Sequence, residues 1–238
     1  MEISRNEIKE LRALQQKKYR EERGLFIVEG EKMVQEALDS ALEVVRVYRR
    51  DEIGPEAMAR ISALSTPSPA LAVVRIPAPR PVSVQRGLCL ALDGIRDPGN
   101  LGTILRLADW FGVDAVYASP DCVEAYNPKV IQASLGAIFR KQPIYCDIDA
   151  LCEAFLKDGV PVLGTFLDGD DLYETALPRE GLIVMGNEAD GIRPEVARKV
   201  SARLLIPSFA QGPTAESLNV AVATAVVVSE IRRRGRNA

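Results

Sequence analysis

Short apolar runs alternate with amphipathic segments along most of the chain after Leu88. The apolar runs cover residues 88–92, 115–119, 143–148, 160–166, 182–185 and 203–207. The segments between them carry apolar residues at helical spacing. Continuous apolar strands that alternate with helices are typical of a mostly parallel sheet with helices on both faces. We therefore expect an α/β fold here, closed by a long helix from about Ser217 to Arg234.

The first part of the chain predicts a smaller α/β unit. Ser4 followed by Glu7 is a capping-box signature, which predicts a helix that runs to about Arg20. Strands are expected at 25–30, 44–50 and 71–76, and helices at 31–40 and 56–64. Three alternate prolines indicate an extended linker over 77–87. The expected organisation is an N-terminal domain 1–76, this linker, and a C-terminal domain 88–238.

Composition and charge narrow the class of protein. The chain of 238 residues is 47% hydrophobic, which is typical of a soluble globular protein. Its net charge is −3, so any surface that binds nucleic acid must be local. The N-terminus is charged and unlike a signal peptide, and the longest apolar run, 220–228, is far short of the ~20 residues that span a bilayer. We expect a cytoplasmic protein without membrane contact.

The sequence contains no histidine, and its four cysteines form no C-x-x-C pair. Histidine-dependent triads and H-E-x-x-H metalloprotease sites are therefore excluded, and a Cys/His zinc site is not expected. Neither G-x-G-x-x-G nor a P-loop is present, which argues against a nicotinamide dehydrogenase or a nucleoside triphosphatase. We expect reduced thiols and no metal.

Four basic residues share one stripe of the first predicted helix, at steps of four, three and eight: Arg5, Lys9, Arg12 and Arg20. Two interpretations remain open for this stripe. It is either a solvated charged face, helped by Glu7 and Glu10, or a surface that follows RNA phosphates.

Three predicted strands end in unusual polar sequences: DGIRDPGN after 88–92, GNEADGIRP after 182–185, and PSFAQGPTAESLN after 203–207. Ligands bind at the carboxyl ends of strands in sheets of this kind. Plain structural explanations also exist. Asn100 sits where a helix N-cap belongs, with Arg106 free to pair with Asp109 on a surface helix. Glu188 could be a solvated turn residue, and Asn219 a cap for a buried apolar helix.

Taken together and in this order, the three strand ends resemble the motifs of the SpoU (TrmH-type) family. These proteins are SAM-dependent RNA ribose 2′-O-methyltransferases of the SPOUT class. The matching residues are Asn100-Leu101-Gly102 with Arg106, Gly186-Asn187-Glu188 with Gly191, and Ser217-Leu218-Asn219. Segment 127–140 resembles the part between the motifs. Segment 25–40 is similar to the family's N-terminal substrate-binding domain, which is related in fold to ribosomal protein L30e.

The resemblance implies a trefoil-knotted SPOUT domain that forms a homodimer through the C-terminal domain. It also implies a structured RNA substrate, ribosomal or transfer RNA, and SAM as methyl donor without a metal. The catalytic residues that it implies are Arg106, Asn100, Glu188, Ser217 and Asn219. Those implied for SAM binding are Thr165, Gly186, Ile206 and Leu218. Arg106 would act as a base or, because a free guanidinium is a very poor base, as the group that organises phosphate and hydroxyl.

Two other functions are weighed against this one. A non-catalytic RNA-binding protein with a degenerate SPOUT domain would not need the intact motif residues. An enzyme acting on small nucleotides would not explain the basic stripe or the basic tail, Arg232, Arg233, Arg234 and Arg236. The segment 208–216 is longer than the family's commoner form, so its contacts are left open.

Overall fold

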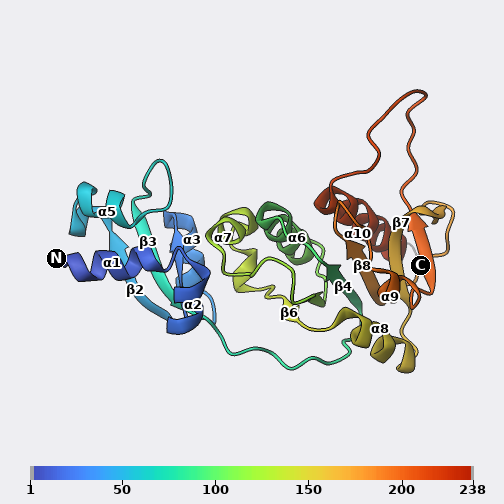
Figure 1. Cartoon of the computed structure of the whole chain (residues 1–238), viewed down its shortest axis with the longest axis horizontal. Coiled ribbons are helices and arrows are strands. Elements are labelled where there is room, and N and C mark those ends of the chain that lie inside the picture. Colours follow the sequence, from blue (N-terminus) through green and yellow to red (C-terminus); the bar gives the residue numbers. More distant parts are fainter. Residues whose placement is uncertain (1–2, 237–238) are drawn as a thin grey trace.

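The computed structural model describes residues 3–236 (Figure 1). The first two residues of the predicted domain 1–76 and the last two of 88–238 lie outside the described residues. The chain forms two sheets. One has three antiparallel strands in the order β1-β3-β2, and the other has six parallel strands in the order β6-β5-β4-β8-β7-β9. The predicted α/β fold with a mostly parallel sheet is confirmed.

The smaller sheet is covered on both faces. Its strands are β1 (Leu25–Glu29), β2 (Val44–Arg49) and β3 (Ala70–Arg75). The helices around it are α1 (Arg5–Ala13), α2 (Lys17–Arg23), α3 (Glu31–Leu38), α4 (Arg50–Ile53) and α5 (Pro55–Ile61). One face packs on α3, and the other packs on α1 and α5.

The single helix predicted from Ser4 to Arg20 is wrong, because the structure breaks it into α1 and α2. The start is as expected, since Ser4 Oγ accepts the N–H of Glu7 at 3.1 Å. The break frees the carbonyl of Leu14, which accepts a hydrogen bond from Arg20 Nη1 at 2.8 Å. Arg20 is thereby turned inward and is 2% exposed. A tertiary contact has overridden local helix propensity here.

The larger sheet follows the predicted strands closely. They are β4 (Leu88–Asp93), β5 (Ala115–Ala118), β6 (Ile144–Tyr145), β7 (Val162–Asp171), β8 (Gly181–Gly186) and β9 (Ala202–Leu205). The helices are α6 (Pro98–Trp110), α7 (Pro128–Ser134), α8 (Ile148–Lys157), α9 (Pro194–Ala197) and α10 (Val220–Arg236), with a 3-10 turn at Ala137–Phe139. As predicted, Asn127 caps α7, accepting the N–H of Lys129 at 2.9 Å. Only β6 is much shorter than expected.

The alternation of side chains along β4 creates two cores. Leu88, Leu90 and Leu92 belong to the core that includes α6, α7 and α10. Cys89 and Ala91 point to the other face, where the core includes α8 and α9. Both faces of the sheet are therefore covered by helices, as parallel sheets require.

Helices α6 and α10 lie side by side, and they are tied together at both ends. Asn219, directly before α10, donates to Asn100 near the start of α6. Arg232, near the end of α10, donates through Nε to the carbonyl of Phe111 at 2.9 Å, just past the end of α6. Because matching ends meet, the two helices run in the same direction.

The smaller sheet packs directly against the C-terminal unit. In Figure 1, α7 lies against the smaller unit, and the core that contains Phe26 of β1 continues into Leu90 of β4. The ring of Tyr126 packs on Phe26 with centroids 4.6 Å apart. Arg20 forms a buried ion pair with Glu124. No helix in the described residues is long and apolar enough to cross a membrane.

Candidate functional site

The turn that follows β8 is built by its own sequence. Asn187 Oδ1 accepts the N–H groups of Ala189 and Asp190, both at 2.8 Å. Gly191 adopts a left-handed φ of 68°, and its N–H bonds the carbonyl of Asn187. A Cβ on Gly186 would lie 2.2 Å from the backbone carbon of Gly191, so this position must be glycine. The turn presents Glu188 at its exposed tip.

The start of α6 differs from the expectation. The N-cap is Asp97, not Asn100, because Asp97 Oδ1 accepts the backbone N–H of Asn100 at 2.8 Å. Asn100 therefore lies in the first turn with its side-chain amide free for other contacts. Gly102 is explained by packing, since a Cβ there would come within 2.5 Å of Ala133 on α7.

Three side chains from distant parts of the sequence form one hydrogen-bonded cluster. Asn219 Nδ2 donates to Asn100 Oδ1 at 2.9 Å, and Asn100 Nδ2 donates to Glu188 Oε1. Asn219 also caps α10, since its Oδ1 accepts the N–H groups of Ala221 and Val222. We call Glu188, Asn100 and Asn219 the polar cluster. It lies at the carboxyl edge of the larger sheet, where α/β folds bind ligands.

A second tie beneath the polar cluster was missed by sequence reasoning. Asp93 ends β4 with a fully buried side chain, and its carboxylate accepts from the backbone N–H of Arg193 at 2.8 Å and from Nε at 2.6 Å. The hydrogen bond to Asp93 raises the pKa of Arg193. The available signal was a carboxylate ending an apolar strand, because a buried charge must be paired. This pair fixes the loop that carries Glu188 relative to β4.

Arg106 and Ser217 do not join the polar cluster. Arg106 is exposed and forms no hydrogen bond or ion pair with any residue of the described range 3–236. The pairing with Asp109 that a plain surface helix would use is absent, because Asp109 binds Arg140 at 2.9 Å. Arg106 is six residues beyond Asn100, which places it about 9 Å along α6 and on a different face. Ser217 lies in the exposed segment 208–219.

The residues predicted to bind SAM lie at the same edge of the sheet. Thr165 is in β7, Gly186 ends β8, and Ile206 directly follows β9, and these three strands are neighbours. Leu218 precedes α10 and is 49% exposed. Thr165 Oγ1 contacts Met185 Sδ at 3.8 Å.

The chemistry of these positions fits an adenosyl group. Ile206 is partly buried against the core, while Leu167 on β7 and Phe209 and Leu218 between β9 and α10 expose apolar surface. A flat adenine ring would cover such surface, and Thr165 and backbone groups would supply the polar contacts.

The other candidate sites are metal-ligating groups and reactive thiols. Among residues 3–236, no group of three His, Cys, Asp or Glu side chains could hold a metal ion. All four cysteines are free. Burial raises the pKa of Cys89 and of Cys152 to about 12 and that of Cys146 to about 11, so these thiols stay protonated and unreactive at neutral pH.

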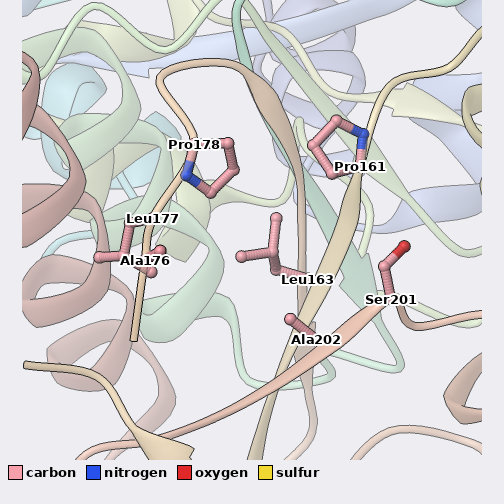
Figure 2. Close-up of a pocket in the computed structure, with 7 residues that line it drawn as sticks. All are labelled: Pro161, Leu163, Ala176, Leu177, Pro178, Ser201 and Ala202. Carbon is pink, nitrogen blue, oxygen red and sulfur yellow. The ribbon is translucent and has the colours of Figure 1, made fainter. Parts of the chain in front are cut away.

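An apolar pocket of about 360 Å³ lies at the opposite edge of the sheet (Figure 2). Pro161 and Leu163 line it at the start of β7, and Ala202 at the start of β9. Its lining includes no charged side chain. The pocket is therefore separate from the polar cluster, which lies where the strands end.

The predicted basic stripe is only partly at the surface. Arg5, Lys9 and Arg12 are exposed on α1, whereas Arg20 is buried in its ion pair with Glu124 and cannot meet a phosphate. Three residues of the basic tail bind within the chain: Arg232 to the carbonyl of Phe111, Arg233 to Glu230, and Arg234 to Glu230 and the carbonyl of Leu172. The side chain of Arg236 lies outside the described part.

The sequence matches known families over both units. Residues 87–229 match the SpoU rRNA Methylase family, and residues 5–73 match the MRM3-like substrate binding domain. The chain belongs to the SpoU rRNA methylase family. The family resemblance seen in the three strand ends is thus confirmed.

Individual SpoU relatives resemble the chain along nearly its whole length. The 23S rRNA (guanosine(2553)-2′-O)-methyltransferase RlmP of Bacillus subtilis is 30% identical over 98% of both chains. A TrmH-family protein from Porphyromonas gingivalis has a solved structure with 42% identity and a TM-score of 0.86, covering 98% of this chain and 99% of that one. An AdoMet-bound rRNA methyltransferase from Sinorhizobium meliloti is 28% identical, with a TM-score of 0.86 over 98% of both chains.

Proposed function

We propose that this chain is a SAM-dependent RNA methyltransferase that transfers a methyl group to a ribose 2′-hydroxyl. The observation that carries the proposal is the polar cluster: Glu188, Asn100 and Asn219 come from three strand ends and bond to one another in a SpoU-family fold. The SAM-bound structure of the Sinorhizobium meliloti relative supports SAM as the donor.

A ribose hydroxyl is a weak nucleophile and must lose its proton as it attacks. Bound SAM supplies an electrophilic methyl group on its sulfonium, which needs no metal. Glu188 Oε1 accepts a hydrogen bond from the amide of Asn100. The second carboxylate oxygen would accept the hydrogen bond of the ribose hydroxyl and take up its proton as the oxygen attacks the methyl group. Arg106 would hold the adjacent phosphate and stabilise the developing negative charge, since a guanidinium stays protonated. Ser217 would complete the site from segment 208–219.

A homodimer would bring Arg106 to the polar cluster. Arg106 does not reach Glu188 within one chain, yet large apolar side chains are exposed on the same pair of helices: Trp110 at 83% on α6 and Val222 at 50% on α10. Exposed apolar side chains on both helices favour a protein interface along this pair. We therefore place Arg106 of one subunit at the polar cluster of the other. The trefoil knot expected of the C-terminal domain stays a prediction.

Ribosomal RNA is the substrate that we favour. The family is described as an rRNA methylase family, and the Bacillus subtilis relative that spans the whole chain is named for 23S rRNA. Residues 3–76 would form the substrate-binding domain, with Arg5, Lys9 and Arg12 contacting phosphates, 77–87 the linker, and the rest the SPOUT domain. The enzyme would act in the cytoplasm. Its RNA affinity should fall as salt rises, because only local basic surface meets phosphate.

Mixed dimers test both the activity and the place of Arg106. Arg106→Ala and Glu188→Ala should each abolish methylation of rRNA while SAM still binds. When the two variants are unfolded and refolded together, a dimer that shares its sites regains one complete site in each mixed pair, or about a quarter of wild-type activity. The assay measures ribose methylation by the refolded protein, with rRNA from cells lacking the gene as the substrate.

Two results would contradict this scheme. Mixed dimers without activity would place Arg106 and Glu188 in the same subunit's site. A wild-type chain that binds neither SAM nor its demethylated product would instead favour a non-catalytic RNA-binding protein.

A further inference from the structure

The N-terminal unit contains a cavity of about 370 Å³ that the methyl-transfer site does not use. It lies between α1 and the smaller sheet, and residues of β1, β2 and β3 line it together with Arg23 at the end of α2. The floor is apolar, because Leu11, Leu14 and Val73 are buried there. Val45, 47% exposed, forms part of the wall.

One wall of the cavity holds a carboxylate in a fixed position. Glu7 Oε1 accepts the hydroxyl of Tyr48 at 2.6 Å and Arg46 Nη1 at 2.7 Å. Burial, together with Glu7, raises the pKa of Tyr48, so its hydroxyl remains a donor to Glu7. Glu7 lines the cavity, so its carboxylate adds an acceptor to this wall.

The rim adds a second pair of opposite charges. Arg23 Nη1 donates to the backbone carbonyl of Glu10 at 3.3 Å, which leaves most of its N–H groups available. The carboxylate of Glu10 is exposed and accepts the amide of Asn6 at 3.1 Å. The cavity therefore combines an apolar floor with guanidinium donors and carboxylate acceptors. A flat heterocycle with both kinds of hydrogen-bonding group matches this lining.

The exposed part of the basic stripe lies beside the cavity on α1. Arg5, Lys9 and Arg12 are exposed and have no partner among the described residues. Lys9 precedes Glu10 at the rim, so the two side chains are about 100° apart around α1. An RNA strand whose phosphates lie on the stripe can therefore place one base at the mouth of the cavity.

We propose that this cavity binds an unpaired nucleobase of the RNA substrate, with guanine preferred; the proposal rests on the RNA-modifying function above. Guanine presents O6 and N7 as acceptors for an arginine fork. Its N1–H and N2–H groups are donors that suit a carboxylate. Adenine presents an amino donor in place of O6, so its edge would face the guanidinium with the wrong polarity.

The test uses the full chain and fluorescently labelled single-stranded RNA pentamers that differ only in the central base. Fluorescence anisotropy should give a dissociation constant for UUGUU roughly tenfold lower than for UUAUU, the discrimination expected of one good bidentate pair. UUIUU, whose inosine lacks only the N2 amino group, should fall between them if a carboxylate reads that edge.

Substitutions at the cavity should remove this preference. Glu10→Gln and Arg23→Gln each remove one recognising charge, and Val45→Trp fills the cavity without changing charge. In each variant the pentamers should bind within about twofold of one another. Glu21→Gln and Arg60→Gln are matched controls elsewhere in the N-terminal unit and should keep the preference. Melting temperatures close to wild type establish that the variants are folded.

The outcomes separate this proposal from the proposed function. Equal binding of all pentamers by the wild-type chain overturns the nucleobase site, as does a preference that survives Val45→Trp. SAM-dependent methylation of rRNA by the same preparation shows that the methyltransferase function stands without it. A guanine preference in a chain that never methylates RNA would support the cavity and contradict the methyltransferase.

Discussion

Asn100 is the residue on which the geometry of the polar cluster depends. Its amide group is the central member, accepting from Asn219 and donating to Glu188. An asparagine amide can do both at once because it carries an acceptor oxygen and a donor nitrogen. Its position is held by Asp97, which caps its backbone N–H at 2.8 Å.

Replacing Asn100 by Ala should lower kcat for methyl transfer by about a hundredfold, because Glu188 and Asn219 would each lose the partner that positions them. SAM binding should change little. Asn100→Asp should be worse still, since it sets a carboxylate against Glu188. Single-turnover transfer of a radiolabelled methyl group measures both. Thr103→Ala, an exposed position on the same helix, is the control, and an equal loss there would contradict the cluster.

At this scale, the sequence motifs predicted which strand ends meet, but not the ion pairs around them. Asn100, Glu188 and Asn219 come together as the three strand ends suggested. The ion pair between Asp93 and Arg193 escaped prediction, because nothing local links positions that are a hundred residues apart. The prediction that Arg20 belongs to the basic stripe was wrong for the same reason, since only the distant Glu124 explains why its side chain turns inward.

Helix α10 positions the polar cluster by its contacts at both ends. Its start supplies Asn219, and Arg232 binds the far end of α6. Its last turns are anchored through Arg234, which donates to the carbonyls of Thr175 at 2.6 Å and Leu172 at 3.0 Å. Glu230 organises this end by accepting from Arg233 and Arg234.

The anchor should weaken in acid. Hydrogen bonds from Arg233 and Arg234 lower the pKa of Glu230 from 4.5 to about 2. A carboxyl group whose pKa is lower in the folded state stabilises the fold above pH 4.5. That stabilisation is lost as the pH falls toward 2. Thermal melting of wild type between pH 6 and 3 should therefore fall more steeply than melting of Glu230→Gln. Glu21→Gln, in an exposed pair with Lys17, should follow wild type, and parallel curves for all three would refute the anchor.

Elements were predicted well wherever packing and local pattern agree. The strands of the parallel sheet are apolar on both faces, so their runs are unambiguous, and Asn127-Pro128 marks the start of α7. Prediction failed for the first helix, since the basic pattern from Arg5 to Arg20 gives no sign that the chain breaks between α1 and α2. The observed start of α6 differs from the predicted one because Asp97 and Asn100 are both good N-cap residues.

In the whole molecule, the two units form one body. The pair of Arg20 and Glu124, the rings of Phe26 and Tyr126, and the shared core hold the smaller sheet on α7. The loop that carries Glu124 also bonds the loop before α6, through the N–H of Val123 and the carbonyl of Ile95 at 2.9 Å. The distance from the basic stripe to the polar cluster is therefore fixed by packing rather than by the linker.

Removing Glu124 should reveal this coupling. Glu124→Ala leaves Arg20 buried without its charge partner and should cost about 3 kcal/mol in the free energy of unfolding. Arg20→Met combined with Glu124→Ala should recover much of that loss, because no unpaired charge remains. Urea unfolding measures the free energies. If the double variant is no more stable than Glu124→Ala alone, the ion pair does not hold the units together.

The continuous core has a consequence for how this enzyme tolerates damage. The linker is exposed at residues 78–83, and a protease can cut there. Yet the cut would break only the covalent connection between the two halves. Their non-covalent contacts would remain, since each half covers apolar surface of the other. The two halves of the nicked protein should stay associated and continue to modify RNA. Exchanging the first half for that of a relative would require the matching surface of α7 to be exchanged as well.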